Sequence, residues 1–205
     1  VVRAMLARPG MTKSVLIAEE RRSSLENDLA GFEGPVYLVP LAWMERITGY
    51  PLHRGILAVG HRPDPDDHTV GRVLARLNQS KNDPLTLLIC VGINNIDNIG
   101  LLFRNAAAFA VDAVLLDPTC HDPLYRKSLR VSIGHVLSMP WARSSPEDWP
   151  NDLDRLRNEW GITLIGAATN ERAQPIDAIE QPMRVGVIVG PEYEGLPDEV
   201  LARCD

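Results

Sequence analysis

Residues 85–116 read LTLLICVGINNIDNIGLLFRNAAAFAVDAVLL, and this stretch decides the fold. Leu85–Val91 is a continuous apolar run, which is typical of a parallel strand buried on both faces. Apolar residues at helical spacing follow between Ile99 and Ala110, and Val111–Leu116 is a second apolar run. The stretch therefore predicts a strand, a helix and a second strand that runs parallel to the first.

The loop after the first of these strands is rich in asparagine. We expect Asn98 to be the N-cap of the helix, because its side-chain oxygen can accept hydrogen bonds from the free N–H groups of the first turn. Arg104 follows six positions later, inside the expected helix. Open α/β sheets bind ligands at the carboxyl ends of their strands, so this loop is the first candidate for a binding site.

Strands and helices are also predicted to alternate on both sides of this unit. Before it we expect strands over 14–18, 36–39 and 55–60, and helices over 19–30 and 41–48. After it we expect helices over 126–138 and 151–160, and strands over 163–168 and 185–189. Proline and aspartate are dense over 61–69, and 70–77 is compatible with a short helix. The sequence thus predicts a small α/β domain over 1–60, a linker over 61–84 and a larger α/β domain with a parallel sheet over 85–205.

Composition sets broad limits on function. The chain has 205 residues, of which 45% are hydrophobic and 23% charged, as in ordinary soluble globular proteins. Its net charge of −6 argues against strong non-specific binding to nucleic acids but is compatible with a local basic face. The cysteines Cys90, Cys120 and Cys204 form no CxxC pair, so reduced thiols and a cytoplasmic compartment are expected. Neither histidines nor cysteines have metal-ligand spacing, and no apolar run is long enough to span a membrane.

Two separated stretches resemble motifs of the SpoU (TrmH-type) RNA ribose 2′-O-methyltransferases, which belong to the SPOUT superfamily. The first motif is matched by NIGLLFRNAA, from Asn98 to Ala107, and the second by VGVIVGPEYEGLP, from Val185 to Pro197. Two motifs in the right order are far more specific than either one alone.

The resemblance implies a fold, a reaction and partners. The fold is a parallel-sheet α/β domain of the SPOUT type (the trefoil-knot family), preceded by a small α/β ribosomal-protein-like domain that binds the RNA substrate. The implied reaction transfers a methyl group from S-adenosylmethionine to a ribose 2′-hydroxyl of rRNA or tRNA. The implied assembly is a cytoplasmic homodimer.

The resemblance also assigns catalytic roles to three residues. Arg104 matches the arginine that activates the 2′-hydroxyl. Because arginine stays protonated, stabilising the forming alkoxide is physically easier than accepting its proton. Asn98 is expected to hold Arg104 or the substrate, and Glu192 to orient the arginine or the loop. The alternatives are a solvated helix arginine, a plain helix cap and a surface carboxylate.

Two further sets of residues are implied to bind ligands. The adenosyl part of the cofactor is expected to lie against main-chain groups of Ala168, Thr169, Gly190, Pro191, Gly195 and Leu196, since glycine lets backbone approach a ligand closely. RNA phosphates are expected to be clamped by Arg126, Lys127 and Arg130 on the helix over 126–138. A simple turn and a solvated charged face are the respective alternatives.

The family has a third motif, containing Ser-Leu-Asn, that completes the cofactor pocket, the knot and the dimer interface, and nothing here matches it. We therefore expect the sequence to be truncated relative to its parent, and the 205-residue polypeptide to bind the cofactor poorly. A catalytically inactive RNA-binding or ribosome-associated protein with the same fold is the alternative function. A nicotinamide-dependent oxidoreductase is disfavoured, because no G-x-G-x-x-G follows any predicted strand.

Overall fold

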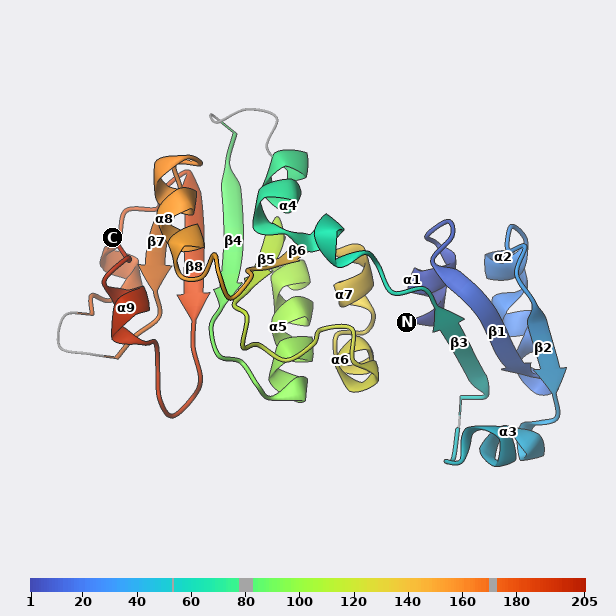
Figure 1. Cartoon of the computed structure of the whole chain (residues 1–205). Coiled ribbons are helices and arrows are strands. Elements are labelled where there is room, and N and C mark those ends of the chain that lie inside the picture. Colours follow the sequence, from blue (N-terminus) through green and yellow to red (C-terminus); the bar gives the residue numbers. More distant parts are fainter. Residues whose placement is uncertain (53, 78–82, 170–172) are drawn as a thin grey trace. The chain divides into compact units, whose positions relative to one another are not determined.

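The chain forms two compact units, Val1–Pro63 and Asp64–Asp205 (Figure 1). The structure is a computed structural model that describes residues 1–52, 54–77, 83–169 and 173–205. The boundary between the units falls directly after Pro63, within the stretch expected to be a linker. Residues 78–82 of that stretch lie outside the described residues.

The smaller unit is built on a three-stranded sheet in the order β2-β1-β3. The central strand β1 (Thr12–Ala18) pairs parallel with β2 (Val36–Val39) and antiparallel with β3 (Ile56–Gly60). Its remaining elements are α1 (Val2–Leu6), the 3-10 helix η1 (Glu19–Leu25), α2 (Glu26–Leu29) and α3 (Leu41–Thr48). The helix expected over 19–30 is therefore a 3-10 helix followed by a single α-helical turn.

The larger unit contains a five-stranded sheet in the order β6-β5-β4-β8-β7, and every neighbouring pair is parallel. The strands are β4 (Leu85–Cys90), β5 (Ala113–Leu116), β6 (Trp141–Arg143), β7 (Thr163–Gly166) and β8 (Arg184–Val189). The predicted parallel sheet is confirmed, and the carboxyl ends of all five strands lie at one edge. The strand β6 was not predicted, because three residues are too few to show a periodic pattern.

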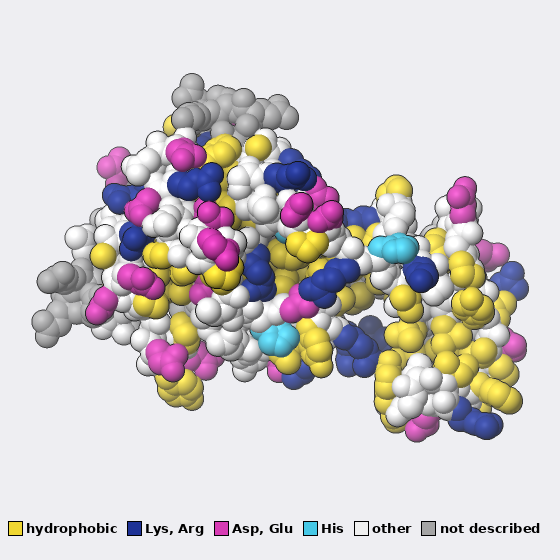
Figure 2. Space-filling model, viewed as in Figure 1, with side chains coloured by type: hydrophobic (Ala, Val, Ile, Leu, Met, Phe, Trp, Pro, Cys, Tyr) yellow, Lys and Arg dark blue, Asp and Glu magenta, His cyan; other side chains and the backbone are white. Residues whose placement is uncertain are grey.

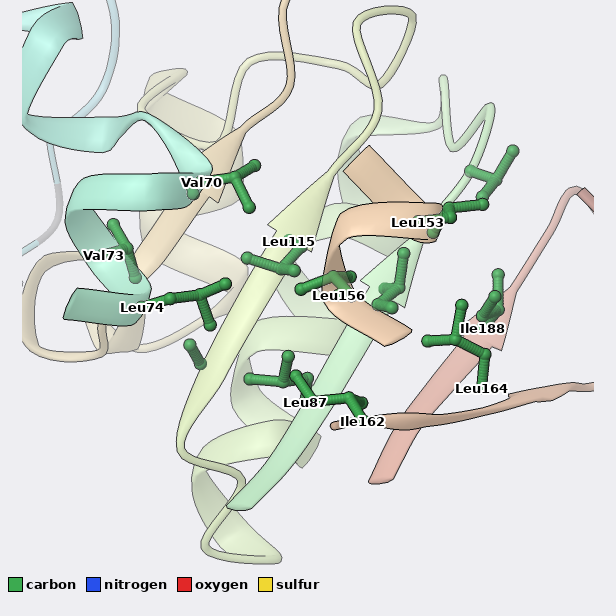
Figure 3. Packing of buried hydrophobic residues seen from close by; sticks show 14 of the residues in the cluster. Val70, Val73, Leu74, Leu87, Leu115, Leu153, Leu156, Ile162, Leu164 and Ile188 are labelled. Atoms are coloured by element: carbon green, nitrogen blue, oxygen red, sulfur yellow. The ribbon is translucent and has the colours of Figure 1, made fainter. Parts of the chain in front are cut away.

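Two helices, α4 (Val70–Leu77) and α8 (Asn151–Asn158), pack on one face of this sheet. Figure 3 shows their apolar side chains meeting those of the strands, and the buried cluster includes Val70, Val73, Leu74, Leu87, Leu115, Leu153, Leu156, Leu164 and Ile188. The helix α4 is therefore part of the core of the larger unit, although its residues lie within the stretch expected to be a linker.

The opposite face of the sheet is covered by α5 (Ile96–Ala108), α6 (Arg126–Val131) and α7 (His135–Ser138). Phe103 of α5 and Val136 of α7 are fully buried there with Cys90 of β4. Successive side chains of a strand point to opposite faces, so a strand covered on both sides needs apolar residues at every position. The strand β4 meets this requirement at every position except the half-buried Thr86.

The segment predicted as one helix over 126–138 is instead the two short helices α6 and α7. The break lies at Ile133 and Gly134, whose φ angles are +56° and +92°. Positive φ is unusual for a β-branched residue, so the sequence did not predict that the helix would be interrupted at Ile133. A last short helix, α9 (Asp198–Leu201), was not predicted either.

Candidate active site

The two motif loops lie side by side at the carboxyl edge of the sheet. Strands β4 and β8 are neighbours, and their last residues, Cys90 and Val189, are paired. A Cβ atom built at Gly92 would lie 3.2 Å from Cγ of Pro191, so the loops after these strands are in van der Waals contact. Sheet pairing thus joins stretches that are far apart in the sequence.

A hydrogen bond links the polar residues of the two motifs. Nδ2 of Asn98 donates to Oε1 of Glu192 over 3.0 Å, between residues 94 positions apart. Glu192 is exposed and Asn98 half-buried, and their hydrogen bond lies at the surface of the edge where ligands bind in open α/β sheets. The structure therefore brings together two of the three residues expected to be catalytic.

The N-cap of α5 is Asn95, so the prediction that Asn98 is the cap was wrong. The side-chain oxygen of Asn95 accepts hydrogen bonds from the backbone N–H groups of Asp97 (2.8 Å) and Asn98 (3.3 Å). The helix consequently begins at Ile96, and Asn98 lies in its first turn. Because Asn95 satisfies the first-turn donors, the side chain of Asn98 is available for Glu192.

Arg104 lies on the exposed surface of α5. Across the described ranges, no hydrogen bond or ion pair engages its guanidinium group, so its charge is available to a ligand. One turn earlier, a Cβ built at Gly100 would lie 2.9 Å from the carbonyl oxygen of Ser128 and 2.7 Å from Cβ of Val131. The absence of a side chain at Gly100 thus lets α5 pack tightly against α6.

The basic helix α6 is docked onto the beginning of α5. Nζ of Lys127 pairs with Oδ2 of Asp97 at 2.7 Å, and the buried Ser128 hydroxyl donates to the carbonyl of Ile96 over 3.1 Å. Lys127 is therefore held against the first turn of α5 instead of standing alone in solvent. Arg126 and Arg130, the other two residues expected to contact RNA, are exposed.

The glycine-rich loop after β8 folds back tightly on itself. A Cβ at Gly190 would lie 2.9 Å from both the carbonyl oxygen of Gly195 and Cδ2 of Leu196. Gly195 has a φ of +69°, and its N–H donates to the carbonyl of Pro191 over 3.2 Å. Leu196 anchors the loop in the core. These residues fit a cofactor held by main-chain groups, because the turn exposes backbone at Gly195 without a side chain.

The other expected cofactor residues lie just beyond β7, which ends at Gly166, two residues earlier than predicted. The N–H of Ala167 donates to the carbonyl of Ile188 over 2.8 Å, so the chain still follows β8 at this point. Ala168 is half-buried and Thr169 exposed. A Cβ built at Gly166 would lie 3.2 Å from Cδ1 of Leu196, which shows that the end of β7 reaches the glycine-rich loop.

Two residues at the same edge were not found by sequence reasoning. The buried carboxylate of Asp117, directly after β5, accepts hydrogen bonds from the N–H groups of Gly92 (3.1 Å) and Cys120 (2.8 Å). Arg143, at the end of β6, donates to four main-chain carbonyls between Asp117 and His121. The position of Asp117 after an apolar run was a usable signal, whereas Arg143 is the last residue of a strand too short to recognise.

Two of the three cysteines of the larger unit, Cys90 and Cys120, are buried, and Cys204 is half-buried. Burial raises the pKa of the Cys120 thiol to about 12 and raises that of Cys90 well above its ordinary value. Over the described residues, no group of three or more His, Cys, Asp or Glu side chains is arranged to hold a metal ion. Within the same residues, no helix is both long and apolar enough to cross a membrane.

The fold and the paired motif loops define a class: an α/β protein with a five-stranded parallel sheet and two polar loops joined by a hydrogen bond at its carboxyl edge. The sequence model of the SpoU rRNA Methylase family matches residues 86–205. An uncharacterized tRNA/rRNA methyltransferase of Mycobacterium tuberculosis is 36% identical over 210 residues, covering 100% of this chain and 68% of the relative. The chain belongs to the SpoU rRNA methylase family.

More distant relatives and solved structures agree with this membership. The 23S rRNA (guanosine(2553)-2′-O)-methyltransferase RlmP of Bacillus subtilis is 28% identical, with 100% of this chain and 74% of the relative covered. The SpoU methyltransferase AviRb from Streptomyces viridochromogenes, solved with AdoMet, superposes with a TM-score of 0.78 at 20% identity, covering 100% of this chain and 75% of that chain. The expected parallel-sheet α/β fold of the SpoU type is therefore confirmed, whereas the likeness of the smaller unit to a ribosomal-protein-like domain stays a prediction.

Proposed function

We propose that this protein transfers a methyl group from S-adenosylmethionine to a ribose 2′-hydroxyl of rRNA or tRNA. Members of the SpoU family are RNA methyltransferases, and RlmP and RlmB among the relatives are named as 23S rRNA guanosine 2′-O-methyltransferases. The observation that carries the proposal is the hydrogen bond between Asn98 and Glu192, which joins the two motif loops at one edge of the sheet.

Arg104 is the catalytic residue in this proposal. S-adenosylmethionine supplies a methyl group that is already activated by its positive sulfur. The guanidinium of Arg104 stabilises the negative charge that develops on the ribose oxygen, because a fixed cation at that position favours the transition state. Arginine does not lose its own proton, so the proton of the hydroxyl leaves to water or to an RNA phosphate. The hydrogen bond between Asn98 and Glu192 holds the two motif loops in a fixed position relative to each other.

The cofactor would be held at the ends of β7 and β8. Its adenosyl group is assigned to main-chain groups of Ala168, Thr169, Gly190, Pro191, Gly195 and Leu196. Support comes from the tight turn at Gly190 and Gly195 and from the approach of Gly166 to Leu196. Main-chain N–H and C=O groups can orient a nucleoside without any charged side chain.

RNA binding is assigned to Arg126, Lys127 and Arg130 and to the smaller unit. The sequence of the smaller unit has eight lysines and arginines against six aspartates and glutamates, a net charge of +2, whereas the larger unit has 13 against 21, a net charge of −8. On the face shown in Figure 2, acidic side chains are scattered over the larger unit. Cations attract the RNA backbone, so this asymmetry favours the smaller unit as an RNA substrate-binding domain.

A homodimer acting in the cytoplasm completes the proposal. The exposed surface of α5 and its end carries the apolar side chains of Leu101 and Phe109, which are 43% and 82% exposed. Exposed apolar groups of this kind often mark contacts with another chain. The three free cysteines fit a reducing compartment.

The test is transfer of tritium from methyl-labelled S-adenosylmethionine to rRNA and tRNA from cells lacking the gene, with mapping of alkali-resistant linkages. The assay uses the full-length protein that the gene encodes. We expect Arg104→Ala to abolish transfer while leaving cofactor binding nearly intact. The matched control is Arg72→Ala, which removes an exposed arginine of α4 that pairs with Asp67. Normal turnover by Arg104→Ala would disprove the role of Arg104, and RNA binding without any transfer would favour the inactive alternative.

A further inference from the structure

The segment 117–125, which connects β5 to α6, carries an aromatic pair that the proposed mechanism does not use. The rings of His121 and Tyr125 have their centroids 5.4 Å apart, with ring planes inclined by 76°. Tyr125 is 50% exposed and directly precedes α6. A half-exposed tyrosine at a ligand-binding edge offers a flat apolar surface to a partner.

Hydrogen bonds hold this segment in a fixed conformation. The guanidinium of Arg143 donates to the carbonyl oxygens of Asp117 (3.2 Å), Pro118 (3.2 Å), Cys120 (2.8 Å) and His121 (3.0 Å). The N–H of Tyr125 donates to the carbonyl of Asp122 over 3.2 Å. A planar guanidinium can satisfy several carbonyls at once, which a lysine ammonium cannot do with the same geometry. Arg143 thus fixes the backbone that presents the aromatic pair.

The segment is also tied to the loop that leads into α5. The N–H of His121 donates to the carbonyl of Ile93 over 2.9 Å, immediately before the asparagine-rich stretch. The carboxylate of Asp117 accepts from the N–H of Gly92 in the same loop. The segment that carries the aromatic pair is therefore attached to the loop that precedes the motif with Asn98 and Arg104.

The order of the strands places this segment away from the expected cofactor loops. In the sheet β6-β5-β4-β8-β7, the loops assigned to the cofactor follow β8 and β7, whereas the segment 117–125 follows β5 on the other side of β4. The helix α6 that continues the segment has three basic residues and no acidic one. Charge and position therefore match the RNA and not the adenosyl group.

We propose that His121 and Tyr125 form a stacking surface for an unpaired RNA base adjacent to the methylated ribose, and that Arg143 is the positioning residue for this surface. The inference rests on the proposed function, because it takes RNA as the ligand. Base stacking on an aromatic ring is tolerant of base identity, so the pair contributes affinity for an unstacked nucleotide and leaves sequence selection to other contacts.

The experiment compares Tyr125→Ala, Tyr125→Phe and Arg143→Lys in the tritium-transfer assay, with the KM for RNA and the affinity for S-adenosylmethionine measured separately. Tyr125→Ala is expected to raise the KM for RNA about 5- to 150-fold, as for the loss of one stacked base. Tyr125→Phe keeps the ring and should retain a KM near that of the wild type. Arg143→Lys should raise the KM for RNA in the same direction, and none of the three should change cofactor affinity.

The matched control is Met183→Ala, which removes a side chain of similar exposure (59%) just before the amino end of β8. An unchanged KM in Tyr125→Ala, or equal effects of Tyr125→Ala and Tyr125→Phe, would overturn the inference. Dissociation of a dimer by Tyr125→Ala would show instead that the pair contacts a second copy. If the wild-type protein transfers no methyl group, the proposed function fails, and binding of a fluorescein-labelled 12-nucleotide polyadenylate still decides whether Tyr125 contacts single-stranded RNA.

Discussion

Of the two asparagines Asn95 and Asn98 near the start of α5, substitution of the first should lower the stability of the protein, and substitution of the second should lower its activity. Asn95→Ala removes the hydrogen bonds that the cap accepts from the N–H groups of Asp97 (2.8 Å) and Asn98 (3.3 Å). Loss of such a cap costs about 1 kcal/mol. In a protein of this size, that cost lowers the Tm by about 3 °C.

Asn98→Ala should behave differently, because the hydrogen bond that it removes lies at the surface. The bond from Nδ2 of Asn98 to the exposed side chain of Glu192 lies at the surface, so its net contribution to folding is about 0.5 kcal/mol. Alanine also has a higher helix propensity than asparagine by about 0.5 kcal/mol, which offsets the loss. We expect little change in stability but a loss of methyl transfer of about tenfold or more, since a misplaced loop disrupts the alignment of reacting groups.

The assay combines urea unfolding, followed by tryptophan fluorescence, with tritium transfer to RNA. Fluorescence reports mainly on the larger unit, because Trp141, Trp149 and Trp160 lie there and only Trp43 lies in the smaller unit. The reasoning would be refuted if Asn98→Ala destabilised the protein more than Asn95→Ala does, or if Asn98→Ala left methyl transfer unchanged.

Two further predictions concern the glycine-rich loop and the buried thiols. Gly190→Ala should weaken binding of S-adenosylmethionine and destabilise the protein by about 1–3 kcal/mol, because the added Cβ would lie 2.9 Å from the carbonyl oxygen of Gly195 and the loop must open. Calorimetry measures the affinity for the cofactor, and urea unfolding measures the stability. Unchanged affinity would contradict the assignment of this loop to the cofactor. Cys120 should resist iodoacetamide at pH 8.5, because its raised pKa of about 12, against 9.0 for a free thiol, lowers the thiolate fraction by about 1,000-fold. Its neutral form is preferred in the folded state, so the associated stability is present below pH 9 and is lost as the pH rises toward 12. Rapid alkylation of folded protein at Cys120, identified by mass spectrometry, would show that the thiol is not buried as described.

The elements that could be predicted are those with a long and unambiguous pattern. The predicted bounds of α3, Leu41–Thr48, and of α4, Val70–Leu77, agree with the structure. The apolar run of β4 was correctly interpreted as a strand buried on both faces, because only a covered strand tolerates apolar residues at every position.

The elements that could not be predicted depend on neighbours distant in sequence. The three residues of β6 form a strand only because they pair with β5. The choice between Asn95 and Asn98 as the cap of α5 depends on where the helix begins, since both residues are asparagines and either could serve as a cap. Arg143 has no local signal at all, because its hydrogen bonds reach carbonyls 22 to 26 residues earlier.

The sequence by itself determined the strand–helix–strand unit over 85–116 and the identity of the two motifs, since both depend only on local patterns and residue types. Only the tertiary structure decided that β8 pairs with β4, which brings Glu192 to Asn98 and the glycine-rich loop to the edge of the sheet at which α5 begins. The physical reason is that the order of strands in a parallel sheet is set by packing the whole sheet between its two helix layers, and no short stretch of sequence contains that information.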